Sequence, residues 1–151
     1  MVLQAGDFAP DFELRNTHGT PIRLSELRGR KVMVVFFPFA FSGICTGELC
    51  EIRDRFDLFA SSDVTLLAVS CDPMFTLKAW AEHEDFEFDL LSDFWPHGSV
   101  ASQYGVFDES HGLAVRGSFL IDEEGIVRWA VVNERGQARD FEAYKEALAS
   151  L

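Results

Sequence analysis

Residues 32–50 read VMVVFFPFAFSGICTGELC, and this stretch joins a strand pattern, a loop and a helix pattern. Its first six residues are apolar and mostly β-branched or aromatic, which is typical of a strand buried on both faces. Beyond the loop, apolar side chains recur at the spacing of one helix face, at Leu49, Ile52, Phe56 and Phe59. The stretch therefore predicts a strand–loop–helix unit that carries Cys45 and Cys50 at the helix start.

The rest of the chain continues this alternation. Strands are predicted at residues 12–14, 22–24, 64–70, 118–121 and 126–132. Helices are predicted after Asp72, which has the pattern of an N-cap before proline, at 99–104 and over the amphipathic tail 141–151. This order is typical of an α/β protein. We predict one domain, residues 1–151, with a thioredoxin-like fold: a mixed central sheet flanked by helices, plus an N-terminal hairpin.

Charge and hydropathy exclude several classes of partner. The 13 basic and 25 acidic residues give a net charge of −12, which disfavours binding to nucleic acid or to an anionic membrane. The longest nearly apolar run, residues 32–41, is too short to span a bilayer. No basic region followed by an apolar run opens the chain, so we expect no secretory signal and a cytoplasmic location.

The three cysteines are too few and too unevenly placed for a disulfide scaffold. Structural zinc sites use short C-x-x-C pairs with two further ligands, whereas four residues separate Cys45 from Cys50 and the four histidines are scattered. We therefore expect no metal and no cofactor. In a reducing compartment, a reactive thiol is the remaining chemical role for such a pair.

Cys45 is the candidate reactive thiol. At a helix start, unpaired N–H groups and the positive end of the helix dipole favour a thiolate. Pro38 lacks an N–H and can shield the sulfur, and the Ser42 hydroxyl can donate or accept beside it. The alternative is an inert buried cysteine, which is the commoner fate of a lone cysteine.

These residues form a recognisable pattern. Pro38-x-x-x-Ser42-x-x-Cys45 resembles the P-x-x-x-[T/S]-x-x-C signature of the peroxiredoxin family, with serine in place of the commoner threonine. The resemblance extends over nearly the whole chain, through GDFAPDFEL at 6–14, LSD at 91–93, YGV at 104–106 and RGSFLID at 116–122. Within the family, FFPFAFSGIC and LLSDFWPHG are most similar to the alkyl hydroperoxide reductase E (AhpE) type.

The resemblance implies a thiol-dependent peroxidase that reduces hydrogen peroxide and organic hydroperoxides. Cys45 would attack the peroxide and become a sulfenic acid, while Ser42 and the Cys45 N–H hold the peroxide oxygens and Pro38 screens the site. Arg116 would stabilise the thiolate and the transition state, and Glu48 would orient this arginine. Taken alone, Arg116 reads as a surface ion-pair residue and Glu48 as a complement to the helix dipole.

Reduction of the sulfenic acid needs a second thiol. A cysteine five residues after the nucleophile resembles the resolving residue of the PrxQ/BCP type, so Cys50 is the candidate. On an intact helix the two Cα atoms lie roughly 8.6 Å apart, beyond the reach of a disulfide, so the first turn would have to unwind. Otherwise Cys50 is a small core residue and an external thiol acts. Cys71 is expected to be a packed structural thiol.

The surroundings of the site allow less definite expectations. Phe39, Phe41 and Trp95 are candidates for an apolar substrate mouth, or else for core or interface residues. The resemblance implies a homodimer and a thioredoxin, glutaredoxin-like or mycoredoxin-like reductant. The alternative functions are a peroxide-sensing redox relay and a thioredoxin-like disulfide oxidoreductase. The second normally needs a C-x-x-C pair, which this chain lacks.

Overall fold

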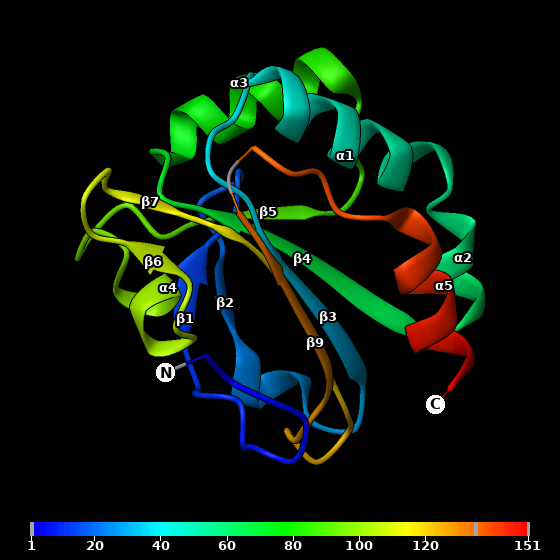
Figure 1. Ribbon diagram of the computed structural model, residues 1–151. Coiled ribbons are helices and arrows are strands. Elements are labelled where there is room, and N and C mark those ends of the chain that lie inside the picture. Colours follow the sequence, from blue (N-terminus) through cyan, green and yellow to red (C-terminus); the bar gives the residue numbers. More distant parts are fainter. Residues whose placement is uncertain (1, 135, 151) are drawn as a thin grey trace.

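The computed structural model describes residues 2–134 and 136–150, and their central feature is a seven-stranded mixed sheet in the order β2-β1-β5-β4-β3-β8-β9. Figure 1 shows this sheet with helices on both of its sides. The strands of the sheet are β1 (Glu13–Arg15), β2 (Pro21–Arg23), β3 (Lys31–Phe36), β4 (Val64–Ser70), β5 (Asp89–Ser92), β8 (Arg116–Ile121) and β9 (Val127–Asn133). The thioredoxin-like fold predicted from the sequence is confirmed.

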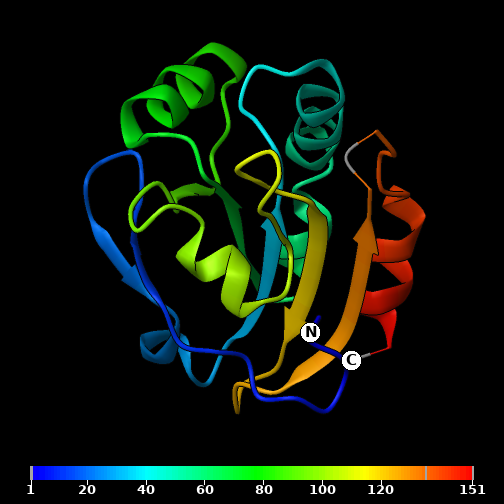
Figure 2. The same cartoon turned by 60° about the vertical axis from the view of Figure 1, so that its left-hand side comes forward.

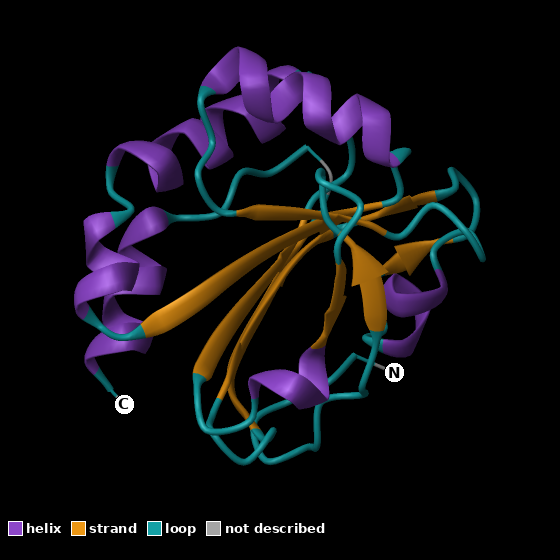
Figure 3. Ribbon diagram, turned by 180° about the vertical axis from the view of Figure 1, so that it is seen from behind, coloured by secondary structure: helices purple, strands orange, loops and turns teal. Residues whose placement is uncertain are grey.

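Strand β3 lies in the interior of the sheet, as expected for a strand with two apolar faces. It pairs in parallel with β4 and antiparallel with β8. Met33 and Val35 face a core that contains residues of α1 (Gly43–Asp54), α2 (Asp57–Ser61), α3 (Met74–Glu84) and α5 (Phe141–Ala149). Val32 and Val34 face a second core that includes residues of α4 (Ser99–Gln103). Figure 2 shows α4 in front of the sheet, and Figure 3 shows the layers from behind.

Smaller elements complete the chain. The predicted N-terminal hairpin is β1–β2, at one edge of the sheet, and β8–β9 is the predicted C-terminal hairpin at the other edge. The sequence patterns did not reveal strand β5, the 3-10 helix η1 (Leu24–Leu27), or the separate hairpin of β6 (Phe107–Asp108) and β7 (Leu113–Ala114). These elements are two to four residues long, too short for a periodic pattern.

Two local predictions differ from the structure. The helix predicted through Phe59 is divided, because α1 ends at Asp54 and α2 starts at Asp57, with Phe56 between them. Asp72 is not the N-cap of α3. That position belongs to Pro73, and no side chain caps the helix. The Asp72 carboxylate accepts hydrogen bonds from Ala40 N–H and the Ser70 hydroxyl instead.

In the described part of the chain, no helix is long and apolar enough to cross a membrane. The same residues contain no group of three or more His, Cys, Asp and Glu side chains placed to hold a metal ion.

Candidate active site

Cys45 lies in the first turn of α1, directly after the loop that leaves the carboxyl end of β3. The residue is completely buried. Its Sγ accepts a hydrogen bond from Arg116 Nη1 at 3.3 Å, and Arg116 is itself only 2% exposed at the start of β8. Because β3 and β8 are adjacent in the sheet, the pairing of two strands brings this thiol and this guanidinium together across 71 residues of sequence.

Glu48 joins Arg116 to a second buried arginine. Arg116 Nη1 donates to Glu48 Oε1 as well as to the sulfur. Arg139 reaches the same carboxylate three times, through its backbone N–H (2.7 Å) and Nε (3.0 Å) to Oε2, and through Nη2 to Oε1 (3.0 Å). Arg139 Nη1 also donates to the Phe36 carbonyl at 2.7 Å. The cysteine, two arginines and one carboxylate thus form a continuous buried network.

The Glu48 carboxylate stays ionised in this network. Burial acts to raise its pKa, but the hydrogen bonds and charge of Arg139 and the charge of Arg116 outweigh burial and hold the pKa below its ordinary value. Its position next to Arg116 is the one expected from the sequence. Arg139 was not expected, because it lies outside every recognised motif, just before the Asp140 N-cap of α5.

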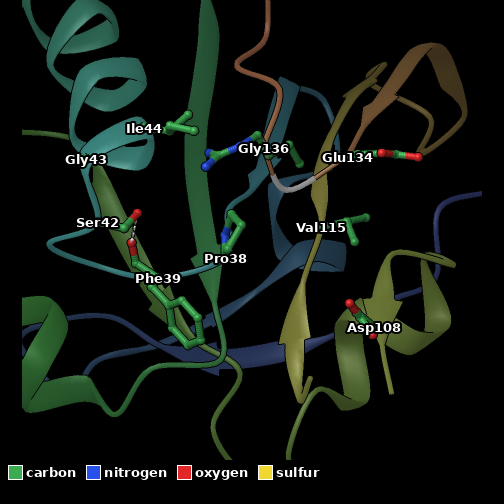
Figure 4. Close-up of a pocket in the computed structure, with 10 residues that line it drawn as sticks. Pro38, Phe39, Ser42, Gly43, Ile44, Asp108, Val115, Glu134 and Gly136 are labelled. Atoms are coloured by element: carbon green, nitrogen blue, oxygen red, sulfur yellow. Dashed lines mark hydrogen bonds between the residues drawn. The ribbon is translucent and has the colours of Figure 1, made fainter. Parts of the chain in front are cut away.

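An open pocket of about 730 Å³ lies at the start of α1, and the residues next to the buried thiol, Gly43, Ile44 and Arg116, line it. Figure 4 shows Pro38, Phe39, Ser42 and Ile44 on one side and Val115, Asp108 and Glu134 on the other, and Arg116 also lines the pocket. Ser42 has the extended backbone of an N-cap, but its hydroxyl donates to the Phe39 carbonyl at 3.1 Å. The first intrahelical bond is Thr46 N–H to the Ser42 carbonyl, so the N–H groups of residues 43–45 have no intrahelical acceptor.

This site has the parts that thiol attack on a peroxide requires: a buried sulfur, a cation within hydrogen-bond distance, and a hydroxyl and helix N–H groups beside an open pocket. The family model described as the AhpC/TSA family matches residues 5–130. The chain belongs to this family. It is a peroxiredoxin, a thiol-dependent peroxidase, as the sequence predicted.

Individual relatives agree with this assignment. The chain is 47% identical to alkyl hydroperoxide reductase E of Mycobacterium tuberculosis (strain ATCC 25618 / H37Rv), over 99% of each protein. It is 33% identical to a peroxiredoxin of Thermoplasma volcanium, over 100% of this chain and 76% of that one. Among solved structures it resembles peroxidoxin BcpB of M. tuberculosis, with a TM-score of 0.85, 35% identity and coverage of 98% and 96%. AhpC of Enterococcus faecalis gives a TM-score of 0.90 at 27% identity, with coverage of 99% and 92%.

The second cysteine of the peroxiredoxin, Cys50, faces away from this network. Its Sγ donates to Glu84 Oε2 at 3.2 Å, and Arg53 Nη1 donates to the Glu84 carbonyl at 2.7 Å. Burial and the hydrogen bond to Glu84 raise the pKa of the Cys50 thiol to about 11. Both cysteines belong to the continuous helix α1, and both are free thiols.

Cys71 follows β4 and is 5% exposed. Burial, together with the charges of Asp93 and Asp72, raises the pKa of its thiol to about 12. It does not line the pocket next to Cys45. A buried thiol with so high a pKa has almost no thiolate at neutral pH and little reactivity.

The three aromatic residues predicted at the substrate mouth lie apart. Phe39 lines the pocket of the peroxiredoxin. Phe41 is turned toward Trp80, with ring centroids 6.2 Å apart. Trp95 is 81% exposed and lines a different pocket, together with Phe75 and other residues. The structure therefore brings only Phe39 of the three to the pocket beside the thiol.

Proposed function

We propose that Cys45 is the nucleophile of this peroxidase and that Arg116, Ser42 and the first-turn N–H groups of α1 stabilise its transition state. The 3.3 Å contact between Arg116 Nη1 and Cys45 Sγ, at the wall of the pocket, is the observation that carries the proposal. The Cys45 thiolate attacks one peroxide oxygen, and the O–O bond breaks. That oxygen stays on sulfur as sulfenic acid, and the departing oxygen takes a proton from water to leave as water or an alcohol.

Each neighbour has a distinct part in this step. Negative charge moves from the sulfur to the departing oxygen, and fixed donors aimed at that oxygen lower the barrier. Arg116 carries the positive charge, and Glu48 with Arg139 holds its guanidinium in place. Pro38 is buried and has no N–H, so it excludes water from the sulfur without donating to it.

The pocket supports both hydrogen peroxide and organic hydroperoxides as substrates. Its volume of about 730 Å³ is much larger than hydrogen peroxide requires. Phe39, Ile44 and Val115 give part of its wall an apolar surface that suits an alkyl group. We expect Phe39→Ala to raise the KM for a long-chain alkyl hydroperoxide more than the KM for hydrogen peroxide.

The test is stopped-flow tryptophan fluorescence after mixing with stoichiometric peroxide. Cys45→Ser should lose the oxidation phase. Arg116→Ala should slow it strongly, whereas Arg128→Ala, an arginine of the exposed face of β9, should leave it unchanged. Rapid oxidation that persists in Cys45→Ser would refute the assignment.

We further propose that Cys50 resolves the Cys45 sulfenic acid. The sulfenic acid would condense with the Cys50 thiol, forming an S–S bond and releasing water. Because both cysteines lie on α1, the helix turn between them must first unwind, which also frees Cys50 from Glu84. A non-reducing peptide map of peroxide-treated protein should contain a Cys45–Cys50 cross-link, and Cys50→Ser should abolish it. A map without this cross-link would assign resolution to an external thiol.

The remaining proposals concern assembly and partners. We expect the chain to act as one domain in the cytoplasm, with a thioredoxin, glutaredoxin-like or mycoredoxin-like protein as reductant. A homodimer would cover the exposed aromatic residues Phe75, Phe94 and Trp95, which line one pocket. A sedimentation measurement at micromolar concentration should give the dimer mass, and Trp95→Glu should give the monomer. A parent chain that sediments as a monomer would refute the dimer.

A further inference from the structure

The loop between β3 and α1, residues 37–42, carries Pro38 and Ser42 to the pocket and is hydrogen-bonded to β4 and to the residues that follow β4. Its first residue donates a backbone hydrogen bond to the Val69 carbonyl at 3.0 Å. Its middle residue, Ala40, donates its N–H to Asp72 Oδ2 at 2.8 Å. Asp72 lies just beyond the end of β4, the parallel neighbour of β3. The Asp72 carboxylate therefore adds a second connection between the site loop and β4, at the middle of the loop.

Asp72 is itself fixed from several directions. The Ser70 hydroxyl donates to the same Oδ2 at 2.7 Å, and Asp72 N–H donates back to Ser70 Oγ at 3.2 Å. Ser92 Oγ donates to the Asp72 carbonyl at 2.6 Å. Ser70 and Ser92 lie opposite each other in the β4–β5 pairing, so β4 holds the carboxylate of Asp72 through Ser70 and β5 holds its backbone through Ser92.

From the sequence, the Asp72 side chain is expected to cap α3, a common role for aspartate, but in the structure it does not. An aspartate before proline at a helix start normally caps the helix with its carboxylate. Here the cap position of α3 is Pro73, and the helix has no side-chain cap. The Asp72 carboxylate thus binds the site loop and does not cap α3. Departures of this kind from the local sequence preference are expected at functional sites.

The loop needs an external restraint because its backbone is strained. Phe41 has a φ of +67°, in the left-handed region that bulky side chains rarely adopt. Strain of this kind persists only where the surrounding structure holds it. Ala40 immediately precedes Phe41, and Ser42 follows it, so a fixed Ala40 N–H determines where the Ser42 hydroxyl and the start of α1 lie.

We propose that Asp72 is a positioning residue of the peroxidase reaction: it holds the 37–42 loop so that Ser42 and the first-turn N–H groups face the bound peroxide. This inference rests on the proposed function, in which Cys45 is the nucleophile and those donors stabilise its transition state. Asp72 binds the loop through the Ala40 N–H and is not among the residues that line the pocket. It therefore acts on the geometry of the donors and not on the substrate.

The expected effect follows from the sensitivity of oriented reactions to small displacements. A misplacement of about 1 Å costs about 100-fold in rate. Asp72→Ala removes the acceptor and should lower the second-order rate constant of peroxide oxidation by about 100-fold. Asp72→Asn keeps one oxygen that can accept from Ala40 and Ser70 but removes the charge, so its loss should be smaller, about 10-fold.

The experiment compares two reactions of the same sulfur. Alkylation of Cys45 by iodoacetamide needs the thiolate but no donors for a peroxide, so both Asp72 variants should stay within about twofold of the parent in this reaction. Asp93→Asn is the matched control. Its carboxylate is also buried and accepts backbone N–H groups, from Val100 (3.1 Å) and Ala101 (2.9 Å), but these belong to α4 and not to the site loop.

The outcomes separate the inference from the proposed function. We expect both Asp72 variants to react more slowly with peroxide while their alkylation rate stays the same. Asp93→Asn should match the parent in both reactions. Peroxidation at the parent rate in folded Asp72→Asn and Asp72→Ala overturns the inference. The inference is also overturned if peroxidation and alkylation slow equally in the Asp72 variants and slow in the same way in Asp93→Asn. That pattern would indicate general destabilisation of the fold. If Cys45→Ser still oxidises, the proposed nucleophile itself is wrong, whatever the Asp72 variants show.

Discussion

Replacing Glu48 by glutamine tests the buried charge network most directly. The side chains of Glu48, Arg116 and Arg139 are 6%, 3% and 2% exposed, respectively, so water screens these charges little. Glu48→Gln leaves two buried guanidinium groups without the carboxylate they share. Removing one partner of a buried ion pair costs about 3–5 kcal/mol, and we expect about 3 kcal/mol because the amide oxygen still accepts a hydrogen bond. Domains of this size lose about 2–4 °C in Tm per kcal/mol, so the Tm should fall by about 6–12 °C.

The pH dependence of the same variant provides a second measurement. The pKa of Glu48 in the folded protein lies below its ordinary value of 4.5, despite the opposing effect of burial, because Arg139 and Arg116 favour the charged form. A group with a depressed pKa stabilises the fold above its unfolded pKa and loses that contribution as the pH falls through the folded value. The free-energy difference between parent and Glu48→Gln should therefore be largest near pH 7 and shrink below about pH 4.5.

Chemical denaturation at a series of pH values, with calorimetry at pH 7, measures both effects. Glu13→Gln is the control. Glu13 pairs with Arg23 at 2.9 Å, close to the 3.0 Å between Glu48 and Arg139, but about half of each side chain in the control pair is exposed. Exposed pairs of this kind contribute little to stability. A Tm loss in Glu48→Gln no larger than that in Glu13→Gln would refute the argument, as would a free-energy difference that stays constant down to about pH 3.

Three further predictions concern individual positions. With a thiol pKa of about 11, Cys50 should be alkylated at pH 8 about 100-fold more slowly than a cysteine at the reference value of 9.0, and Glu84→Gln should speed the reaction. Mass spectrometry of the labelled peptide checks this, and fast labelling in the parent contradicts it. Gly47→Ala should stabilise α1 by about 0.5–1 kcal/mol, because no atom lies within 4 Å of the added Cβ, and should slow formation of the internal disulfide without slowing peroxidation. Equal disulfide rates in stopped-flow and quench assays would count against helix unwinding. Gly98→Ala should lower the Tm sharply, because Gly98 has a φ of +71° and its Cβ would lie 2.2 Å from the Phe107 ring; an unchanged melting curve would be inconsistent with this packing.

The fold was predictable because the sequence of each central strand by itself indicates a buried strand. The continuous apolar run before Pro38 can only be buried on both faces, and the helix pattern beyond it sets the order of the elements. The candidate nucleophile was likewise visible, since its neighbours in sequence are its neighbours in space. Phe56 was assigned to one long helix because a periodic pattern does not register the break between α1 and α2.

Two supporting residues, Arg139 and Asp72, were not predictable, because sequence separation hides their partners, whereas Arg116 and Glu48 were expected from the resemblance to the family. Arg139 meets Glu48 across 91 positions, and only the packing of the segment before α5 against α1 brings them together. Asp72 was assigned to the helix that follows it, since local capping is the commonest use of an aspartate before proline. Its actual partner is the backbone N–H of Ala40. Every residue except proline has such a group, so the types of side chain in a sequence do not indicate which N–H will bind the carboxylate.

The peroxide step and the resolving step have opposite mechanical requirements, and both act on the first two turns of α1, which contain Cys45, Glu48 and Cys50. The peroxide donors must be fixed, and Asp72 on one side and the Glu48 network on the other restrain the loop and Arg116. Resolution by Cys50 would instead require the turn of α1 between the two cysteines to unwind. That turn is weakened in two ways: Ser42 donates to Phe39 and leaves α1 without a side-chain cap, and Gly47 lies within the turn. A missing cap costs about 1 kcal/mol and an internal glycine about 0.5–1 kcal/mol. Glu48 lies in the same turn, however, so unwinding also has to break its contacts with Arg116 and Arg139, the larger cost in this balance.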